Sequence, residues 1–236
     1  MLPRRPTARW LLVALAVVTA VHLVAQVVGG HAFADATQVL LMPLLAALLW
    51  VETSGTGPRS RLVTLVLLAL GLSWLGDSVP RLTSGDAAFL VMVAFFLLAQ
   101  VAFIAAFLPF RARSVLHVHR RRLLVYVAAV LALVIACVGG AADLLVPVLV
   151  YGACLGTMAV LSTGVNQVTA VGGALFLVSD GLIALDAFAP GFDLTGQDFW
   201  VMATYVLAQA LIVAGVLLER DRADATSTQT DAARVR

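Results

Sequence analysis

Two aspartates lie inside long apolar stretches, which are costly surroundings for a carboxyl group. Asp77 ends a run that begins near Leu62, and Asp180 lies at a similar depth in the run that begins near Val165. Ionisable residues inside a membrane span usually face a cavity or a partner and mark function. Two carboxyl groups that meet in a pocket of low dielectric do not both ionise, so one keeps a proton while the other acts as a base. The pair therefore predicts acid/base chemistry of the kind used in glycoside hydrolysis. The alternative is that each Asp only bonds neighbouring helices and fixes their packing.

A few other polar groups are expected at the same depth, in the half of the membrane opposite the arginine-rich loops. Tyr205 and Gln209 are four residues apart and share one helix face. Tyr205 either donates to a substrate or satisfies Gln209. Gln100 and Gln209 fit an interhelical hydrogen bond as well as a functional role. Tyr151 is a candidate for the site or an interfacial aromatic, and Asp186 lies close enough to the membrane edge to be interfacial.

Small and aromatic residues surround the two aspartates. Gly76 precedes Asp77 and Ser179 precedes Asp180, and small residues let membrane helices approach closely. We count Ser179 among the candidate site residues. Trp74 and Phe176 share the helix face of the following Asp, so they either wall an apolar pocket or pack as ordinary core aromatics.

The sequence lacks the motifs of metalloenzymes, serine hydrolases and nucleotide-binding proteins. The sequence contains no HExxH, no CxxC, no GxSxG, no P-loop and no GxGxxG. His22 is alone in its apolar run, and Cys137 and Cys154 are read as small packing residues. We therefore expect no metal, no cofactor and no nucleic-acid partner. An acid/base reaction on a membrane-soluble substrate remains.

The elements that must position these residues are transmembrane helices. The 236 residues are 62% hydrophobic and 12% charged, with a net charge of +2. Spanning helices need about 20 mostly apolar residues. The sequence predicts an all-α, polytopic bundle with helices over 10–28, 37–52, 60–79, 86–108, 123–139, 144–162, 165–188 and 199–218. We expect one transmembrane domain over residues 1–218, with halves of about 1–110 and 120–218, and a disordered cytoplasmic tail over 219–236.

The basic residues predict the orientation of the bundle. All fifteen are arginine, and only Arg81 falls in a loop of the opposite parity from the others. An excess of basic residues in one set of loops marks the cytoplasmic side. Both termini are therefore predicted to be cytoplasmic. The arginine-only, Ala/Val/Leu-rich usage suggests a bacterium with a GC-rich genome, and so a bacterial cytoplasmic membrane. Membrane lipids are the expected surroundings.

The first apolar run also has features of a signal peptide, since basic residues precede it and Ala32-Phe33-Ala34 resembles a cleavage site. The run is long for such a peptide, and the repeat described next needs a first helix. We therefore favour a retained helix.

The chain looks internally duplicated. Three pairs of segments recur in the same order with offsets of 104, 103 and about 109 or 110 residues. The pairs are LLMPLL (40–45) with LLVPVL (144–149), SWLGDSV (73–79) with FLVSDGL (176–182), and FLVM…LLAQ (89–100) with FWVM…VLAQ (199–209). Four helices in each half give both halves the same orientation. This predicts a parallel 4+4 repeat with a site between the halves.

Four segments in this order resemble the YhhN/lysoplasmalogenase family: MPLLAALL (42–49), LSWLGDSV (72–79), GGALFLVSDGLIAL (172–185) and YVLAQALI (205–212). The resemblance covers about residues 37 to 215. It implies a hydrolase that cleaves the vinyl ether bond of lysoplasmalogens, releasing a fatty aldehyde and a glycerophospho-headgroup. The substrate class implied is a lysophospholipid or ether lipid.

The resemblance also gives the candidate residues roles. Asp77 and Asp180 would be the acid and the base, in an order left open, while Tyr205 and Gln209 would position the water or the glycerol oxygen. The sequence departs from the family pattern at Met42 and Gln100, where the family often has Lys and His. Two other classes stay open: a small transporter or lipid-binding protein without catalysis, and a purely structural protein in which both aspartates tolerate Asn.

Overall fold

Eight long helices make up the protein, as the sequence predicts. The computed structural model describes residues 5–55 and 59–234, and these residues contain no strand. All eight helices are long and apolar enough to cross a membrane. They are α1 (Pro6–Val28), α2 (His31–Glu52), α3 (Arg61–Ser78), α4 (Asp86–Phe107), α5 (Arg120–Ala141), α6 (Leu145–Val165), α7 (Gln167–Phe188) and α8 (Gln197–Arg234).

Short turns and polar caps set several helix ends. The 3₁₀ turns η1 (Val79–Leu82), η2 (Leu108–Arg113) and η3 (Ala142–Leu144) follow α3, α4 and α5. The side chain of Asn166 caps α7 by accepting from the amide of Thr169 at 3.0 Å. The same side chain donates to the carbonyl of Gly215 at 2.8 Å. One residue thus starts α7 and ties it to α8.

Two helices extend beyond the predicted apolar runs. α2 begins at His31 instead of residue 37, and the hydroxyl of Thr37 in its first turns donates to the carbonyl of Phe33. α8 continues to Arg234 where we expected a disordered tail from residue 219. No Gly or Pro interrupts that segment, and Arg220 and Asp224 form an i,i+4 ion pair at 3.6 Å that favours a helix. Hydropathy marks where a chain enters lipid and does not mark where a helix ends.

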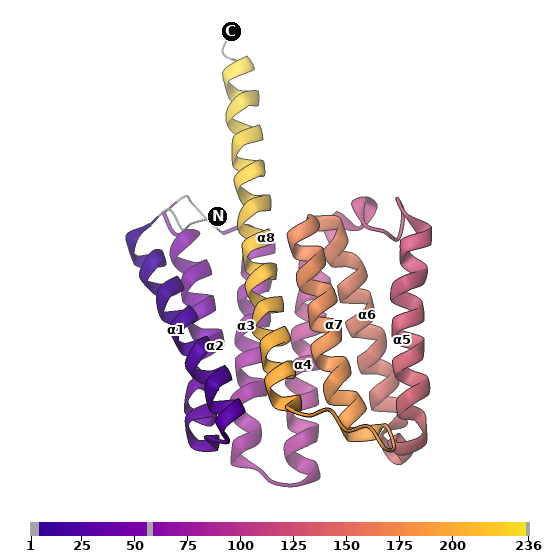
Figure 1. Cartoon of the computed structure of the whole chain (residues 1–236). Helices are drawn as coiled ribbons and strands as arrows, with labels where there is room; N and C mark the ends of the chain where they lie inside the picture. The colour runs from indigo at the N-terminus through magenta and orange to yellow at the C-terminus, as the bar shows by residue number, and fades with distance from the viewer. Residues whose placement is uncertain (1–4, 56–58, 235–236) are drawn as a thin grey trace.

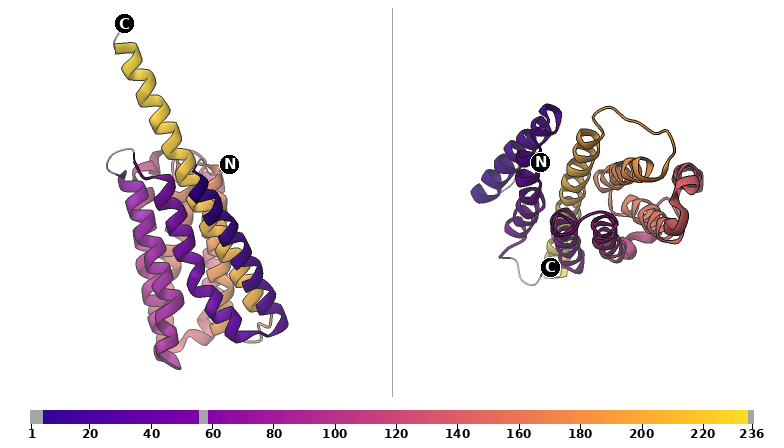
Figure 2. Two further views of the ribbon diagram at one scale, coloured as in Figure 1. Left: turned by 90° about the vertical axis from the view of Figure 1, so that its left-hand side faces the viewer. Right: turned by 90° about the horizontal axis from the view of Figure 1, so that it is seen from below.

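The helices form an upright bundle with α8 inside it (Figures 1 and 2). Consecutive helices pack side by side except α4 and α5, which are not in contact within the described part of the chain, and α8 also contacts α1, α2, α3 and α6. Both ends of the described chain lie at the same end of the bundle, where α8 projects past the other helices (Figure 1). We call this the terminal end and the opposite one the far end. α3 runs toward the far end, so Asp77 and Arg81 lie there.

The most extensive helix contact in the bundle is between α7 and α8, and a glycine contributes to it. A Cβ atom on Gly172 would lie 2.8 Å from the carbonyl oxygen of Ala208. Only a residue without a side chain lets the two backbones approach this closely.

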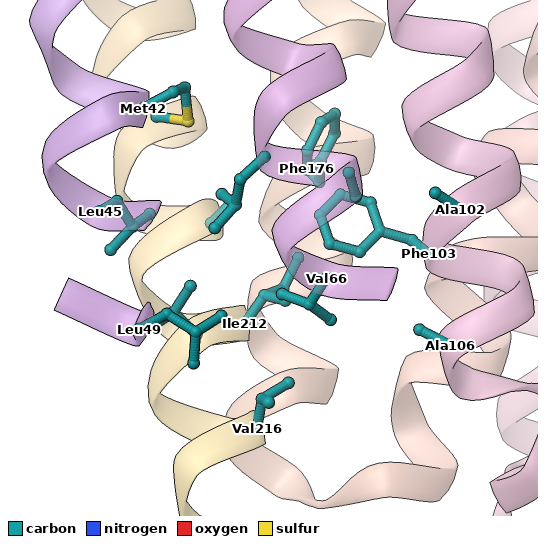
Figure 3. Close-up of a cluster of buried hydrophobic side chains, with 14 of the residues drawn as sticks. Met42, Leu45, Leu49, Val66, Ala102, Phe103, Ala106, Phe176, Ile212 and Val216 are labelled. Carbon is teal, nitrogen blue, oxygen red and sulfur yellow. The ribbon is translucent and has the colours of Figure 1, made fainter. Parts of the chain in front are cut away.

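The core lies between the two halves (Figure 3). Buried apolar side chains from α2, α3, α4, α7 and α8 meet there, including Met42, Leu45, Phe103, Phe176 and Ile212. Many large apolar side chains on the outer faces of the bundle are exposed, as expected for helices that face lipid.

The predicted repeat is only partly reflected in the packing. α4 packs on α6, and α2 packs on α8, as a 4+4 repeat would require. α5 packs on α7, whereas α1 and α3 are not in contact within the described part of the chain. The parallel repeat therefore stays a prediction.

Candidate functional site

Asp77 is held by three neighbouring side chains at the far end of the bundle. It is the penultimate residue of α3, and 8% of it is exposed. Its Oδ2 accepts from the hydroxyl of Tyr205 on α8 at 2.8 Å. Its Oδ1 accepts from Nε2 of Gln38 on α2 at 3.1 Å. Its backbone carbonyl accepts from Nε of Arg81 at 3.0 Å. Two elements besides α3, α8 and α2, therefore hold the carboxyl group, and η1 holds the backbone of the same residue.

Asp180 on α7 is equally buried but more loosely held, with 7% of it exposed. Its Oδ2 accepts from the hydroxyl of Tyr151 on α6 at 2.5 Å. The amide of Gln100 on α4 lies close enough to interact with both groups, yet neither of its polar atoms has a hydrogen-bond partner among the described residues. Gln100 is fully buried. A buried amide without partners is costly and is suited to bind water or a ligand.

The two aspartates line one polar cavity of about 260 Å³. Helices from both halves of the chain contribute to its wall, because α1, α2, α3 and α4 meet α7 and α8 there. The lining residues are Gln26, Gln38, Asp77, Met92, Phe96, Ser179, Asp180, Ile183, Asp186, Gln197, Asp198, Val201, Met202 and Tyr205. The structure thus brings both carboxyl groups and Tyr205 to the same chamber.

An apolar cavity of about 70 Å³ adjoins the polar one. α4, α5, α6 and α7 form it, and its wall is almost entirely hydrocarbon and aromatic apart from Tyr151 and Asp180. Four residues line both cavities: Met92, Phe96, Asp180 and Ile183. Asp180 therefore lies on the boundary between the two chambers, whereas Asp77 lines the polar one alone.

A connected set of aromatic rings extends from the cavities toward the terminal end. Tyr205 makes edge-to-face contacts with Phe96 and Phe176, both at 5.7 Å between ring centroids. Phe176 contacts Phe103 in the same way, and Phe103 stacks on Phe107 at 5.8 Å. All five rings are buried, and Phe176, Phe103 and Phe107 line neither cavity. We call these five residues the aromatic layer.

The remaining sequence candidates lie at different distances from the chambers. Ser179 lines the polar cavity and donates to the carbonyl of Val201 at 3.0 Å. Gln209 lies in the core beside the layer and donates to Ser73 at 3.1 Å. Trp74 lines neither cavity: it is 37% exposed, and its indole donates to the carbonyl of Val39.

Sequence reasoning missed Gln38 and left Arg81 without a role at the site. Arg81 donates through Nη2 to Oε1 of Gln38 at 2.7 Å and forms an ion pair with Asp35. The isolated position of Arg81 in the sequence was the available signal. Nothing in the local sequence connects Gln38 to Asp77, since the contact depends on how α2 packs against α3.

No group of His, Cys, Asp and Glu suited to hold a metal ion occurs among the residues the structure describes. His22 instead bonds locally, with Nδ1 2.9 Å from the hydroxyl of Thr37.

Comparisons with known proteins agree with this architecture. A family model described as the YhhN family matches residues 33–216, which span α2 to α7 and most of the membrane part of α8. The lysoplasmalogenases of Mycobacterium bovis and Mycobacterium tuberculosis are each 33% identical to this chain over 215 residues, or 86% of this chain and 77% of each relative. No solved structure matches. The chain belongs to the YhhN family.

Proposed function

We propose that this protein is a membrane-embedded hydrolase that cleaves the vinyl ether bond of lysoplasmalogens, using Asp77 and Asp180 as its acid and base. The observation that carries the proposal is the pair of adjoining chambers with both carboxyl groups on their walls. The name of its mycobacterial relatives, lysoplasmalogenase, points to the same substrate.

The shape of the site suits a lipid with one chain. The apolar cavity would take the alkenyl chain, and the polar cavity would take the glycerol and the headgroup. The vinyl ether joins these two parts of the molecule, so it would lie at the boundary, next to Asp180. A group that reacts where a substrate changes from apolar to polar is well placed for this chemistry.

The reaction needs one acid, one base and one water. The acid protonates the vinyl carbon on the chain side, which leaves positive charge on the ether carbon and oxygen. Water adds to the ether carbon while the base removes its proton. The hemiacetal then breaks into a fatty aldehyde and the glycerophospho-headgroup. Tyr151 and Tyr205 would orient the carboxyl groups, and Gln100, which lies beside Tyr151 and Asp180, would help to orient that pair.

The transporter alternative receives less support. A transporter needs a polar route to both sides of the membrane. The polar side chains that line the cavity come from the parts of their helices nearer the far end, and the buried rings of Phe103, Phe107 and Phe176 lie toward the terminal end.

The first test is aldehyde release by the purified protein from a lysoplasmalogen. We expect Asp77→Asn and Asp180→Asn each to lower kcat by at least about a hundredfold, the usual contribution of a general acid or base. Asp86→Asn, on an exposed residue that lines neither cavity, is the matched control and should keep wild-type turnover. In D₂O the aldehyde should carry one deuterium beside its carbonyl, and a saturated alkyl ether should not react. Wild-type turnover by either aspartate variant would refute its assigned role.

We also propose that both termini face the cytoplasm, so that the site opens toward the outer leaflet. The arginine-rich loops lie at the terminal end with the termini, which supports this orientation. A fluorescent protein fused after α8 should fold and fluoresce, and a periplasmic phosphatase fused there should be inactive. The reverse result would invert the orientation.

A further inference from the structure

The two aspartates differ in which of their oxygens are already occupied. Both oxygens of Asp77 accept a hydrogen bond, one from Gln38 and one from Tyr205. Asp180 accepts one from Tyr151 on Oδ2, and the amide of Gln100 lies near the same carboxyl group. An oxygen that accepts a hydrogen bond from an amide cannot carry a proton directed at that amide.

Arg81 decides which way the amide of Gln38 points. A guanidinium group only donates, so the atom of Gln38 that lies 2.7 Å from Nη2 of Arg81 must be the oxygen. The nitrogen of the amide therefore faces Oδ1 of Asp77 at 3.1 Å. Arg81 is itself fixed, since its Nε donates to the backbone carbonyl of Asp77 and its Nη1 pairs with Asp35. The amide cannot flip without breaking this set of contacts.

We infer that Arg81 and Gln38 are positioning residues that hold Asp77 as the carboxylate base and leave Asp180 as the proton-carrying acid. The inference rests on the proposed function and decides the order of roles within it. The charged and titratable groups nearest Asp77 are Arg81 and Tyr205, with Asp35 behind Arg81. Asp180, Asp186 and Asp198 line the same chamber.

The chambers support the same assignment independently. Asp180 lines both cavities, so it reaches the chain side of the bond, where the proton must be added. Asp77 lines the polar cavity alone, where water enters. A division of roles by environment is common in two-carboxyl sites.

The full cycle balances with these roles. Asp180 gives its proton to the chain-side vinyl carbon, and a C–H bond forms. A water oxygen bonds to the ether carbon while Asp77 takes the water's proton. Asp77 then returns this proton to the glycerol oxygen as the ether C–O bond breaks, and the hemiacetal hydroxyl gives its proton to Asp180. Both aspartates end as they began, and one water is consumed.

Turnover of variants tests the positioning role. We expect Gln38→Ala and Arg81→Met to lower kcat roughly tenfold or more, because the carboxylate loses a donor, while KM stays near the wild-type value. Arg81→Lys should recover most of kcat, since an ammonium group also donates to the oxygen of Gln38. Gln167→Ala is the matched control and should keep the wild-type kcat, because Gln167 is an exposed glutamine at the start of α7 that lines neither cavity. Wild-type kcat in Gln38→Ala and Arg81→Met would overturn the inference, as would failure of Arg81→Lys to exceed Arg81→Met.

Infrared spectra give a second readout that needs no turnover. The carbonyl stretch of a protonated carboxyl group should disappear in Asp180→Asn and persist in Asp77→Asn. The opposite pattern would reverse the two roles and overturn the inference. If the wild-type protein shows the expected spectrum but releases no aldehyde, the proposed function fails while the assignment of the proton stands.

Discussion

Gln100 presents the sharpest conflict between stability and function at the scale of single residues. Its amide is fully buried, and neither polar atom has a partner among the described residues. We expect Gln100→Leu to raise the free energy of unfolding by about 1–3 kcal/mol, because the unpaired amide is removed, and to lower kcat. Denaturation monitored by circular dichroism, together with aldehyde release, measures both.

Gln209→Leu is the control for this prediction. The amide of Gln209 donates to Ser73 at 3.1 Å, so its loss leaves the serine hydroxyl unpaired. This variant should be less stable than wild type. If Gln100→Leu were also destabilised, the amide of Gln100 would have a partner in the resting protein.

The sequence was most informative about residues that are unfavourable in an apolar span whatever their neighbours are. An aspartate in an apolar span is expensive wherever it points, so Asp77 and Asp180 could be singled out before any packing was known. A glutamine in an apolar span is much less unfavourable, so the sequence did not single out Gln38. Its contact with Asp77 depends on how α2 packs against α3. Trp74 shares the expected helix face, but its indole bonds to the backbone of α2 outside the chambers.

At the scale of elements, the contact between α7 and α8 positions the site, because α7 carries Asp180 and α8 carries Tyr205. Gly172→Ala would place a methyl group 2.8 Å from the carbonyl of Ala208. We expect this overpacking to cost about 1–3 kcal/mol of stability and to lower kcat by shifting α8. Thermal unfolding in detergent and aldehyde release measure the two effects.

Gly71→Ala on α3 is the matched control, since a Cβ atom there meets nothing within 4 Å. Its stability should lie within about 1 kcal/mol of wild type, the usual helical difference between the two residues. Equal stability of the two variants would show that α7 and α8 can separate freely.

Helix number and type followed from the length of the apolar runs, whereas helix ends did not. The start of α2 at His31 and the extension of α8 to Arg234 depend on local polar contacts and on helix propensity. At the terminal end, Glu219 on α8 pairs with Arg113 of η2 at 2.6 Å, a contact between residues that are far apart in the sequence. Hydropathy cannot report such a contact.

At the scale of the whole molecule, the separate apolar cavity should allow the preference for the length of the alkenyl chain to be engineered. Gly152 lines the apolar cavity, and an added Cβ would meet Val134 at an ordinary 3.9 Å. We expect Gly152→Leu to lower kcat/KM roughly tenfold for long alkenyl chains, by excluding about two methylene groups, and to spare short chains. Competition between substrates of different length measures the ratio.

Gly139→Leu is the control, because Gly139 lies on the exposed face of α5 and lines neither cavity. It should leave the length preference unchanged. If Gly152→Leu lowered kcat/KM equally for all alkenyl chain lengths, the alkenyl chain would not bind in the apolar cavity. The sequence alone could not predict this chamber, since its wall combines residues from four helices with no common motif.

Because the polar cavity lies near the far end of the bundle, we expect lipids in the leaflet at that end to reach the carboxyl groups directly. A lysolipid in the opposite leaflet would first flip across the bilayer. In sealed vesicles that carry the protein in a single orientation, hydrolysis would therefore be biphasic: a fast phase consumes one leaflet, and a slow phase proceeds at the rate of lipid flip-flop.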